Sequence, residues 1–242
     1  MNERFSFPDN IDATMWDLDG VLINTIQSDE KLARIAVVLA LKSTGMVEQE
    51  AMSLVERVIS ADLLRKWIHI DIPIFWHLVL NAFKGATGID LSAQKESIIK
   101  TYQDARNSEA LPLLPGAKAA WEASPGRVGV VSTNFTSHIK AILKNSGLPT
   151  PDGLIVVGKD RVAPRKPDAA PWLYAAQLAG QPKRSLAIED SVENLKGLHE
   201  GTLAAQVRTQ WHLVGMGTGS ASIEEMTELK NSGIINNAYR NL

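Results

Sequence analysis

The sequence predicts an α/β protein with a doubly wound parallel sheet, a Rossmann-like core, and an all-helical domain inserted after its first strand. Two observations lead to this fold class. Short β-rich runs alternate with helical segments after Pro115, which is typical of a parallel sheet. An apolar strand near the start of the chain is followed by residues 25–110, where only helical periodicity is found.

The expected core strands are short runs of apolar and β-branched residues. They span residues 13–17, 128–131, 154–157 and 185–188, with a candidate further strand at 203–207. The expected core helices span residues 137–145, 169–179, 192–200 and 222–230. The first strand belongs with the later ones, so residues 1–23 and 112–242 are assigned to the core domain. Residues 215–219 are glycine-rich but lack the lysine of a P-loop, and we interpret them as a flexible connection.

Residues 24–111 form the expected helical domain. Leu32, Ile35 and Val38 recur at helical spacing, and Gly45 ends that run. Further helices are expected at residues 52–67, 75–83 and 92–107, with Pro73 as a break, Gly85 as a stop and Ser92 as an N-cap. A basic and aromatic cluster lies near the break; we interpret it as packing and surface residues, with a substrate pocket as the alternative. Its members are Arg57, Arg65, Lys66, Trp67, His69, Trp76 and His77.

Composition excludes several classes of protein. The 242 residues include 25 basic and 27 acidic ones, a balance that does not favour nucleic acid as a partner. The absence of cysteine excludes disulfides, thiolate metal sites and a cysteine nucleophile. The N-terminus is too polar for a signal peptide and the apolar runs are too short to cross a membrane. We therefore expect a soluble, cytoplasmic protein with no membrane partner, as a monomer or weak homodimer.

Polar residues follow the predicted strands at the ends where ligands bind in open parallel sheets. Asp17 and Asp19 end the first strand, and two carboxylates at alternate positions of an extended chain point the same way. The strand at 128–131 leads into Ser132, Thr133 and Asn134, the strand at 185–188 leads into Glu189 and Asp190, and Lys166 lies in a loop before a helix. Clustered carboxylates suit Mg²⁺, whereas a hydroxyl and an ammonium suit phosphate oxygens.

Each of these residues also has an ordinary structural interpretation. Asp17 and Asp19 are typical of a turn at a strand end, and residues 132–134 are typical of a helix N-cap. Glu189 and Asp190 are favoured by the dipole at the start of a helix, and Lys166 resembles a solvated loop lysine. Their occurrence together, in this order, favours the functional interpretation.

The chain resembles the haloacid dehalogenase superfamily, in the branch of β-phosphoglucomutase and phosphoglycolate phosphatase. The resemblance is carried by residues 17–20 (Asp-Leu-Asp-Gly), the strand at 128–131 leading into Ser132, Lys166 with Pro167, and residues 189–191 (Glu-Asp-Ser). It covers nearly the whole chain if residues 24–111 are the helical cap domain of that branch. It implies a Mg²⁺-dependent phosphatase acting on a small phosphorylated metabolite, such as a sugar phosphate or a phosphoglycolate-like compound, through an aspartyl-phosphate.

The resemblance also implies a role for each residue. Asp17 would be the nucleophile, Asp19 the general acid and base, and Lys166 the cation that neutralises Asp17 and the phosphate. Magnesium would be held by Asp17, the main-chain carbonyl of Asp19, and Asp190, with help from Glu189. The substrate phosphate would be bound by Ser132, Thr133, Asn134, Gly20 and Thr25.

Two other functions remain open. One is a phosphosugar mutase of the β-phosphoglucomutase type, although such mutases carry a histidine where this chain has Asp29. The other is a non-catalytic protein that binds a phosphorylated ligand on the same fold. Asp19 argues against a dehalogenase, because the dehalogenases lack this second carboxylate.

Overall fold

The structure is a computed structural model that describes residues 5–65, 72–205 and 208–242. The chain divides into two compact units. One unit consists of Met1–Asn24 and Ala110–Leu242 and contains the sheet, and the other consists of Thr25–Glu109 and is built from helices in its described residues. Each unit is described by itself below.

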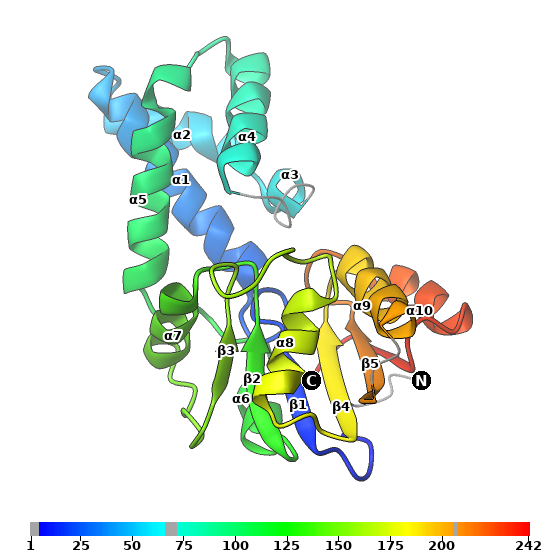
Figure 1. Cartoon of the computed structure of the whole chain (residues 1–242). Coiled ribbons are helices and arrows are strands. Elements are labelled where there is room, and N and C mark those ends of the chain that lie inside the picture. The colour runs from blue at the N-terminus through cyan, green and yellow to red at the C-terminus, as the bar shows by residue number, and fades with distance from the viewer. Residues whose placement is uncertain (1–4, 66–71, 206–207) are drawn as a thin grey trace. The chain divides into compact units, whose positions relative to one another are not determined.

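Across the described ranges, the sheet has six parallel strands in the order β3-β2-β1-β4-β5-β6 (Figure 1). The strands are β1 (Ala13–Trp16), β2 (Arg127–Val131), β3 (Ile155–Val157), β4 (Arg184–Glu189), β5 (Gln210–Met216) and β6 (Asn237–Tyr239). In register, Ala13 of β1 lies opposite Arg127 of β2 and Ser185 of β4. This strand order is that of a doubly wound fold and confirms the predicted fold class.

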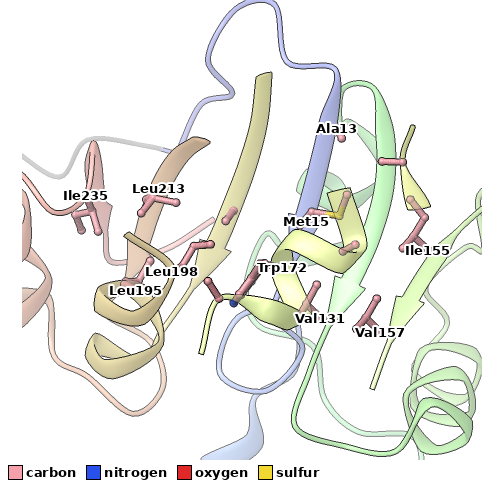
Figure 2. Close-up of a cluster of buried hydrophobic side chains, with 14 of the residues drawn as sticks. Ala13, Met15, Val131, Ile155, Val157, Trp172, Leu195, Leu198, Leu213 and Ile235 are labelled. Carbon is pink, nitrogen blue, oxygen red and sulfur yellow. The ribbon is translucent and has the colours of Figure 1, made fainter. Parts of the chain in front are cut away.

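Helices connect the strands of this unit. They are α6 (Ala117–Glu122), α7 (Thr136–Asn145), α8 (Ala170–Leu178), α9 (Val192–Ala204) and α10 (Ile223–Asn231). Figure 2 shows the buried core on one face of the sheet, where Met15 and Val131 from neighbouring strands face Trp172 of α8, and Leu195 and Leu198 of α9. Because successive residues of a strand point to opposite faces, Trp16 packs on the other side, with its ring 6.4 Å from that of Trp121 in α6. Helices therefore cover both faces, as a parallel sheet requires.

The strand predicted at residues 203–207 was wrong for residues 203–205, and residues 206 and 207 lie outside the described residues. Helix α9 continues to Ala204, and Leu203 lies on its surface with 68% of the residue exposed. The strand lies later, at Gln210–Met216, where it pairs in register with β4. The apolar run at 203–207 resembled a strand because a helix end carries no periodicity of its own over so few residues. The short edge strand β6 was not predicted.

The helical unit contains α1 (Thr25–Ser43), α2 (Glu48–Val58), α3 (Ala61–Arg65), α4 (Ile72–Thr87), a 3-10 turn (Ser92–Gln94) and α5 (Lys95–Ser108). Three boundary predictions were wrong. The helix expected at residues 52–67 is divided, because α2 ends at Val58 and α3 begins at Ala61. Gly85 lies inside α4, which ends before Gly88, a glycine with φ of 75°. Ser92 does not cap α5, because residues 92–94 form the 3-10 turn and α5 begins after Gln94. Pro73 lies in the first turn of α4, where its missing N–H is tolerated.

The basic and aromatic cluster of this unit is only partly described. Residues 66–71, with Lys66, Trp67 and His69, lie outside the described residues, as does the side chain of Arg65. Trp76 is fully buried, and its ring lies 5.5 Å from Phe75 and 5.4 Å from Tyr102. Trp76 is therefore a packing residue between α4 and α5, which agrees with the structural interpretation.

The two chain segments that join the units are held together within the sheet-containing unit. The backbone N–H of Asn24 donates to the carbonyl of Pro112 at 2.8 Å, and Ile23 forms an isolated antiparallel bridge with Leu113. The polypeptide thus leaves and re-enters this unit at adjacent points. In the part of the chain that the structure describes, no helix combines the length and apolarity needed to cross a membrane.

Replacing Leu195 by alanine should lower the free energy of unfolding by about 2–5 kcal/mol, because its fully buried side chain fills the core between α9 and the sheet. Urea denaturation measures this loss. Leu203→Ala on the same helix is the matched control, since its exposed side chain should cost no more than about 0.5 kcal/mol. Equal losses in the two variants would contradict this account of the core.

Candidate active site

The carboxyl ends of β1, β2 and β4 bring the predicted polar residues to one edge of the sheet. Asp17 follows β1 directly, and its backbone N–H donates to the carbonyl of Ile188 at 2.9 Å, which continues the ladder to β4. Ser132 follows β2 and donates in the same way to Val157 at 3.1 Å. The first residue after β4 is Asp190. The positions of these side chains are therefore set by the register of the three strands.

Three buried carboxylates and one ammonium form the centre of this edge. Among the described residues, Asp17, Glu189 and Asp190 each present an oxygen within 4.8 Å of the others. Lys166 lies against two of them: its Nζ donates to Oδ1 of Asp17 at 2.5 Å and to Oε2 of Glu189 at 2.6 Å. The Lys166 side chain is only 2% exposed, so it is not the solvated loop lysine of the alternative interpretation.

Glu189 is held on both of its carboxylate oxygens. Oε2 accepts from Lys166, whereas Oε1 accepts from the backbone N–H groups of Asp190 and Ser191, at 3.0 and 3.1 Å. These bonds occupy Glu189 with protein donors and aim it at Lys166. The side chain of Ser191 in turn caps α9 by accepting from the N–H of Asn194 at 3.3 Å.

The electrostatics of this group favour a bound cation. Burial raises the pKa of the Asp17 carboxyl well above its ordinary value of 3.8, and the charge of Glu189 adds to that effect. Burial and the charges of Glu189 and Asp17 also raise the pKa of Asp190. Burial lowers the pKa of Lys166, but the facing carboxylates outweigh it and raise the pKa overall. Three carboxylates beside one ammonium leave an excess of negative charge that a divalent cation with oxygen ligands would neutralise, so these residues fit Mg²⁺.

Packing by α8 and α9 keeps Lys166 in place. The ring of Trp172, on α8, lies beneath the ammonium, with Nζ 4.5 Å from the ring centroid. On α9, a Cβ at Gly197 would collide with the carbonyl oxygen of Pro167, so only glycine allows the helix to approach this loop so closely. Neither Trp172 nor Gly197 was predicted as part of the site, because their roles depend on how α8 and α9 pack against the loop of Lys166.

A second chain of hydrogen bonds holds the carboxylate of Asp19. Nδ2 of Asn134 donates to Oδ2 of Asp19 at 2.5 Å and to Oγ of Ser132 at 3.1 Å. Ser132 also accepts from the backbone N–H of Asn134. The carboxylate of Asp19 lies outside the acidic group of Asp17, Glu189 and Asp190, and its predicted contribution to a metal is through its main-chain carbonyl.

The remaining predicted residues differ in their placement. Gly20 is buried against Asp190, and Thr133 is exposed in the loop after β2. Thr25 begins α1 in the helical unit, where it is buried and its carbonyl accepts from Oγ of Ser28 at 3.1 Å. The structure thus brings together the predicted residues of the sheet-containing unit other than Thr133. The phosphate-binding roles of Ser132, Thr133, Asn134, Gly20 and Thr25 stay predictions.

The loop after β5 was not predicted to belong to this site. The hydroxyl of Thr218 donates to the carbonyl of Gly20, and the backbone N–H of Ser220 donates to Oδ2 of Asp190 at 2.6 Å. The interpretation of residues 215–219 as a flexible connection was therefore wrong: the run ends β5, and Thr218 and the adjacent Ser220 bond to two of the predicted motifs. A correct placement of β5 in the sequence would have indicated that this loop belongs to the site, because the carboxyl end of β5 lies at the same edge of the sheet.

The family of the chain follows from comparison with known proteins. The haloacid dehalogenase-like hydrolases match residues 11–201, which include Asp17, Ser132, Lys166 and Asp190. The chain belongs to this family of hydrolases. No protein of curated function matches it.

Solved structures share this fold over nearly the whole chain. A predicted phosphoglycolate phosphatase from Haemophilus somnus 129pt is 18% identical, with a TM-score of 0.69 over 96% of this chain and 94% of the other. CbbY from Rhodobacter sphaeroides, in complex with xylulose-1,5-bisphosphate, is 17% identical, with a TM-score of 0.58 over 96% and 94%. A defluorinating L-2-haloacid dehalogenase is 18% identical, with a TM-score of 0.52 over 86% and 82%. At these identities the likeness shows the fold.

Replacing Lys166 by methionine should lower the free energy of unfolding in metal-free buffer by about 3–5 kcal/mol, because it leaves buried carboxylates without their cation. Chemical denaturation measures the loss. Lys42→Met is the control, since its ion pair with Glu48 is solvent-exposed and should contribute about 1 kcal/mol or less. If the Lys166 variant were no less stable than the control, the buried cluster would not have the charge described here.

Magnesium should stabilise the protein more at about pH 8 than at about pH 5. The raised pKa values of Asp17 and Asp190 mean that the native state holds protons that the unfolded state releases. The free energy of unfolding of the metal-free protein therefore falls as pH rises from the ordinary carboxyl pKa through the raised values. Bound magnesium would offset this loss and would compete with protons at lower pH. Melting temperatures measured with MgCl₂ and with chelator at both pH values test this prediction. A rise in melting temperature on adding MgCl₂ that is the same at both pH values would contradict it.

Proposed function

We propose that this protein is a Mg²⁺-dependent phosphatase that hydrolyses a small phosphorylated metabolite through an aspartyl-phosphate on Asp17. One observation carries the proposal: Asp17 lies against Lys166 within a buried acidic group, while a separate carboxylate, Asp19, is held close by through Asn134. A nucleophile and a general acid require these two different environments at one site.

The chemistry takes two steps on these residues. A carboxylate oxygen of Asp17 attacks phosphorus and the ester bond to the leaving oxygen breaks, with Asp19 giving its proton to that oxygen. Asp19 then takes a proton from water, which attacks the phosphorus of the aspartyl-phosphate and releases inorganic phosphate. Lys166 and Ser132 neutralise and bind the phosphoryl oxygens. Asp17 and Asp190, with the carbonyl of Asp19, would hold Mg²⁺, which supplies positive charge against the phosphate; Glu189 mainly orients Lys166.

The substrate class we propose is a sugar phosphate or a phosphoglycolate-like compound. It is supported by the likeness to a predicted phosphoglycolate phosphatase and to CbbY in complex with a sugar bisphosphate. The helical unit, residues 25–109, is proposed to act as a cap domain that selects the substrate.

A mutase is the second candidate, and one observation in the helical unit weighs against it. Asp29, at the position of the mutase histidine, is buried opposite Arg106, with its Oδ1 3.6 Å from Nε of the arginine. The side chains are 2% and 9% exposed, so the pair joins α1 and α5 inside this unit. A carboxylate in that setting supports packing rather than proton transfer with a sugar hydroxyl.

A dehalogenase and a phospholigand sensor remain as outcomes of the test. A halide leaves without a proton, whereas an alkoxide leaving group needs a general acid. The hydrogen bond from Asn134 to Asp19 holds such an acid in place and therefore favours phosphate ester hydrolysis. A sensor would have no need of that carboxylate.

Asp17→Asn should lower phosphate release by at least about a thousandfold, because the amide cannot act as the nucleophile. The measurement is phosphate release from a panel that includes phosphoglycolate, hexose phosphates and pentulose bisphosphates, with Mg²⁺ and with chelator. Asp152→Asn, an exposed carboxylate, is the matched control and should retain full activity.

Four outcomes would contradict the proposal. Activity near wild type in the Asp17 variant would exclude the aspartyl-phosphate. Halide release from 2-haloacids without phosphate release would indicate a dehalogenase. Isomerised phosphosugar, detected by phosphorus NMR without release of phosphate, would indicate a mutase, and metal-dependent binding with no turnover would indicate a sensor.

A further inference from the structure

We infer that the loop after β5, residues 217–220, is a positioning element that holds Asp190 for metal binding, through Thr218 and Ser220. The inference rests on the proposed function, because it assumes that Asp190 is a magnesium ligand. Neither Thr218 nor Ser220 takes part in a chemical step. Thr218 acts through Gly20, and Ser220 acts through Asp190.

Ser220 binds Asp190 at two points. Its backbone N–H donates to Oδ2 of the carboxylate at 2.6 Å, and its hydroxyl donates to the main-chain carbonyl of Asp190 at 3.0 Å. The same carbonyl accepts from the N–H of Ala221 at 3.2 Å. The carboxylate is thereby fixed in rotation, with one oxygen occupied by a backbone donor.

Thr218 ties the same loop to the turn after Asp19. Its hydroxyl donates to the carbonyl of Gly20, while the N–H of Gly20 donates to the carbonyl of Ile23 at 2.9 Å. Residues 217–220 therefore join the turn that carries Asp19 to the turn that carries Asp190. These two turns lie at the ends of neighbouring strands, β1 and β4, and the loop fixes the spacing between them.

The approach of these three segments is too close for any side chain at two positions. A Cβ at Gly219 would overlap Oδ2 of Asp190 and would lie 2.8 Å from the Cα of Gly20. Gly20 has φ of 80°, and a Cβ there would likewise overlap the Asp190 carboxylate. The glycines are thus required by contact with a proposed metal ligand rather than by chain flexibility.

Residues that orient a metal ligand set the affinity of the site, and their loss typically lowers affinity about 10–100-fold. We therefore expect Thr218→Val to raise the dissociation constant for Mg²⁺ about tenfold, because valine keeps the shape of threonine and loses the hydrogen bond. Thr218→Ser should restore near wild-type affinity. Gly219→Ala should weaken binding at least as much, because the added methyl group displaces the carboxylate of Asp190.

The measurement is calorimetric titration of the metal-free protein with MgCl₂, so the readout does not depend on turnover. Thr227→Val is the matched control, since its hydroxyl also donates to a backbone carbonyl, that of Ile223 at 2.7 Å, on the exposed face of α10. Gly85→Ala is the control for Gly219, because a Cβ there meets no atom within 4 Å. Near-ultraviolet circular dichroism shows that each variant is folded before its affinity is compared.

Asp190→Asn in the same titration separates the two levels of the proposal. If wild type binds Mg²⁺ and Asp190→Asn does not, the metal site stands. In that case, wild-type affinity in Thr218→Val and Gly219→Ala overturns the positioning role alone. If wild type does not bind Mg²⁺, or Asp190→Asn binds equally well, the proposed metal site is wrong and the inference falls with it.

Discussion

The burial of three carboxylates beside a single ammonium is the constraint on which the structure of this protein depends. Asp17, Glu189 and Asp190 come from two neighbouring strand ends, and like charges removed from water repel one another strongly. The arrangement persists because Lys166 binds two of the carboxylates, while backbone N–H groups bind Glu189 and Asp190. The surrounding elements serve this arrangement: α8 places Trp172 under the ammonium and the loop after β5 supports Asp190.

The strand order explains how such distant parts of the chain meet. With β1 between β2 and β4, the residues after three strands share one edge, although Asp17 lies more than a hundred positions from Ser132 and Asp190 in the sequence. Lys166 comes from the connection between β3 and α8 and reaches the same edge. The fold that brings these residues together is shared with solved structures at 17–18% identity.

The sequence was sufficient to predict strands β1 to β4 and the polar residues that follow them, because short apolar strands ending in Asp17, Ser132 and Glu189 carry a strong local signal. The sequence was insufficient where the position of an element or the role of a residue depends on tertiary contacts. The strand at Gln210–Met216 was placed too early, and the loop after it was therefore not recognised as part of the site. Ser92 matched a capping pattern, yet the 3-10 turn displaced the helix start. The roles of Trp172 and Gly197 depend on helix packing, which no short sequence pattern encodes.

The two chain segments that join the units are hydrogen-bonded to each other, and this has a consequence for how the protein can change during evolution. Asn24 and Pro112 are hydrogen-bonded neighbours, so the whole segment between them is topologically a loop closed at its base. The entropy of closing a loop grows only slowly with its length. Insertions, deletions or even replacement of this segment would therefore alter the stability of the sheet-containing unit little. If the helical unit selects the substrate, as proposed, exchanging this one module would change the specificity and leave the polar centre at the edge of the sheet unchanged.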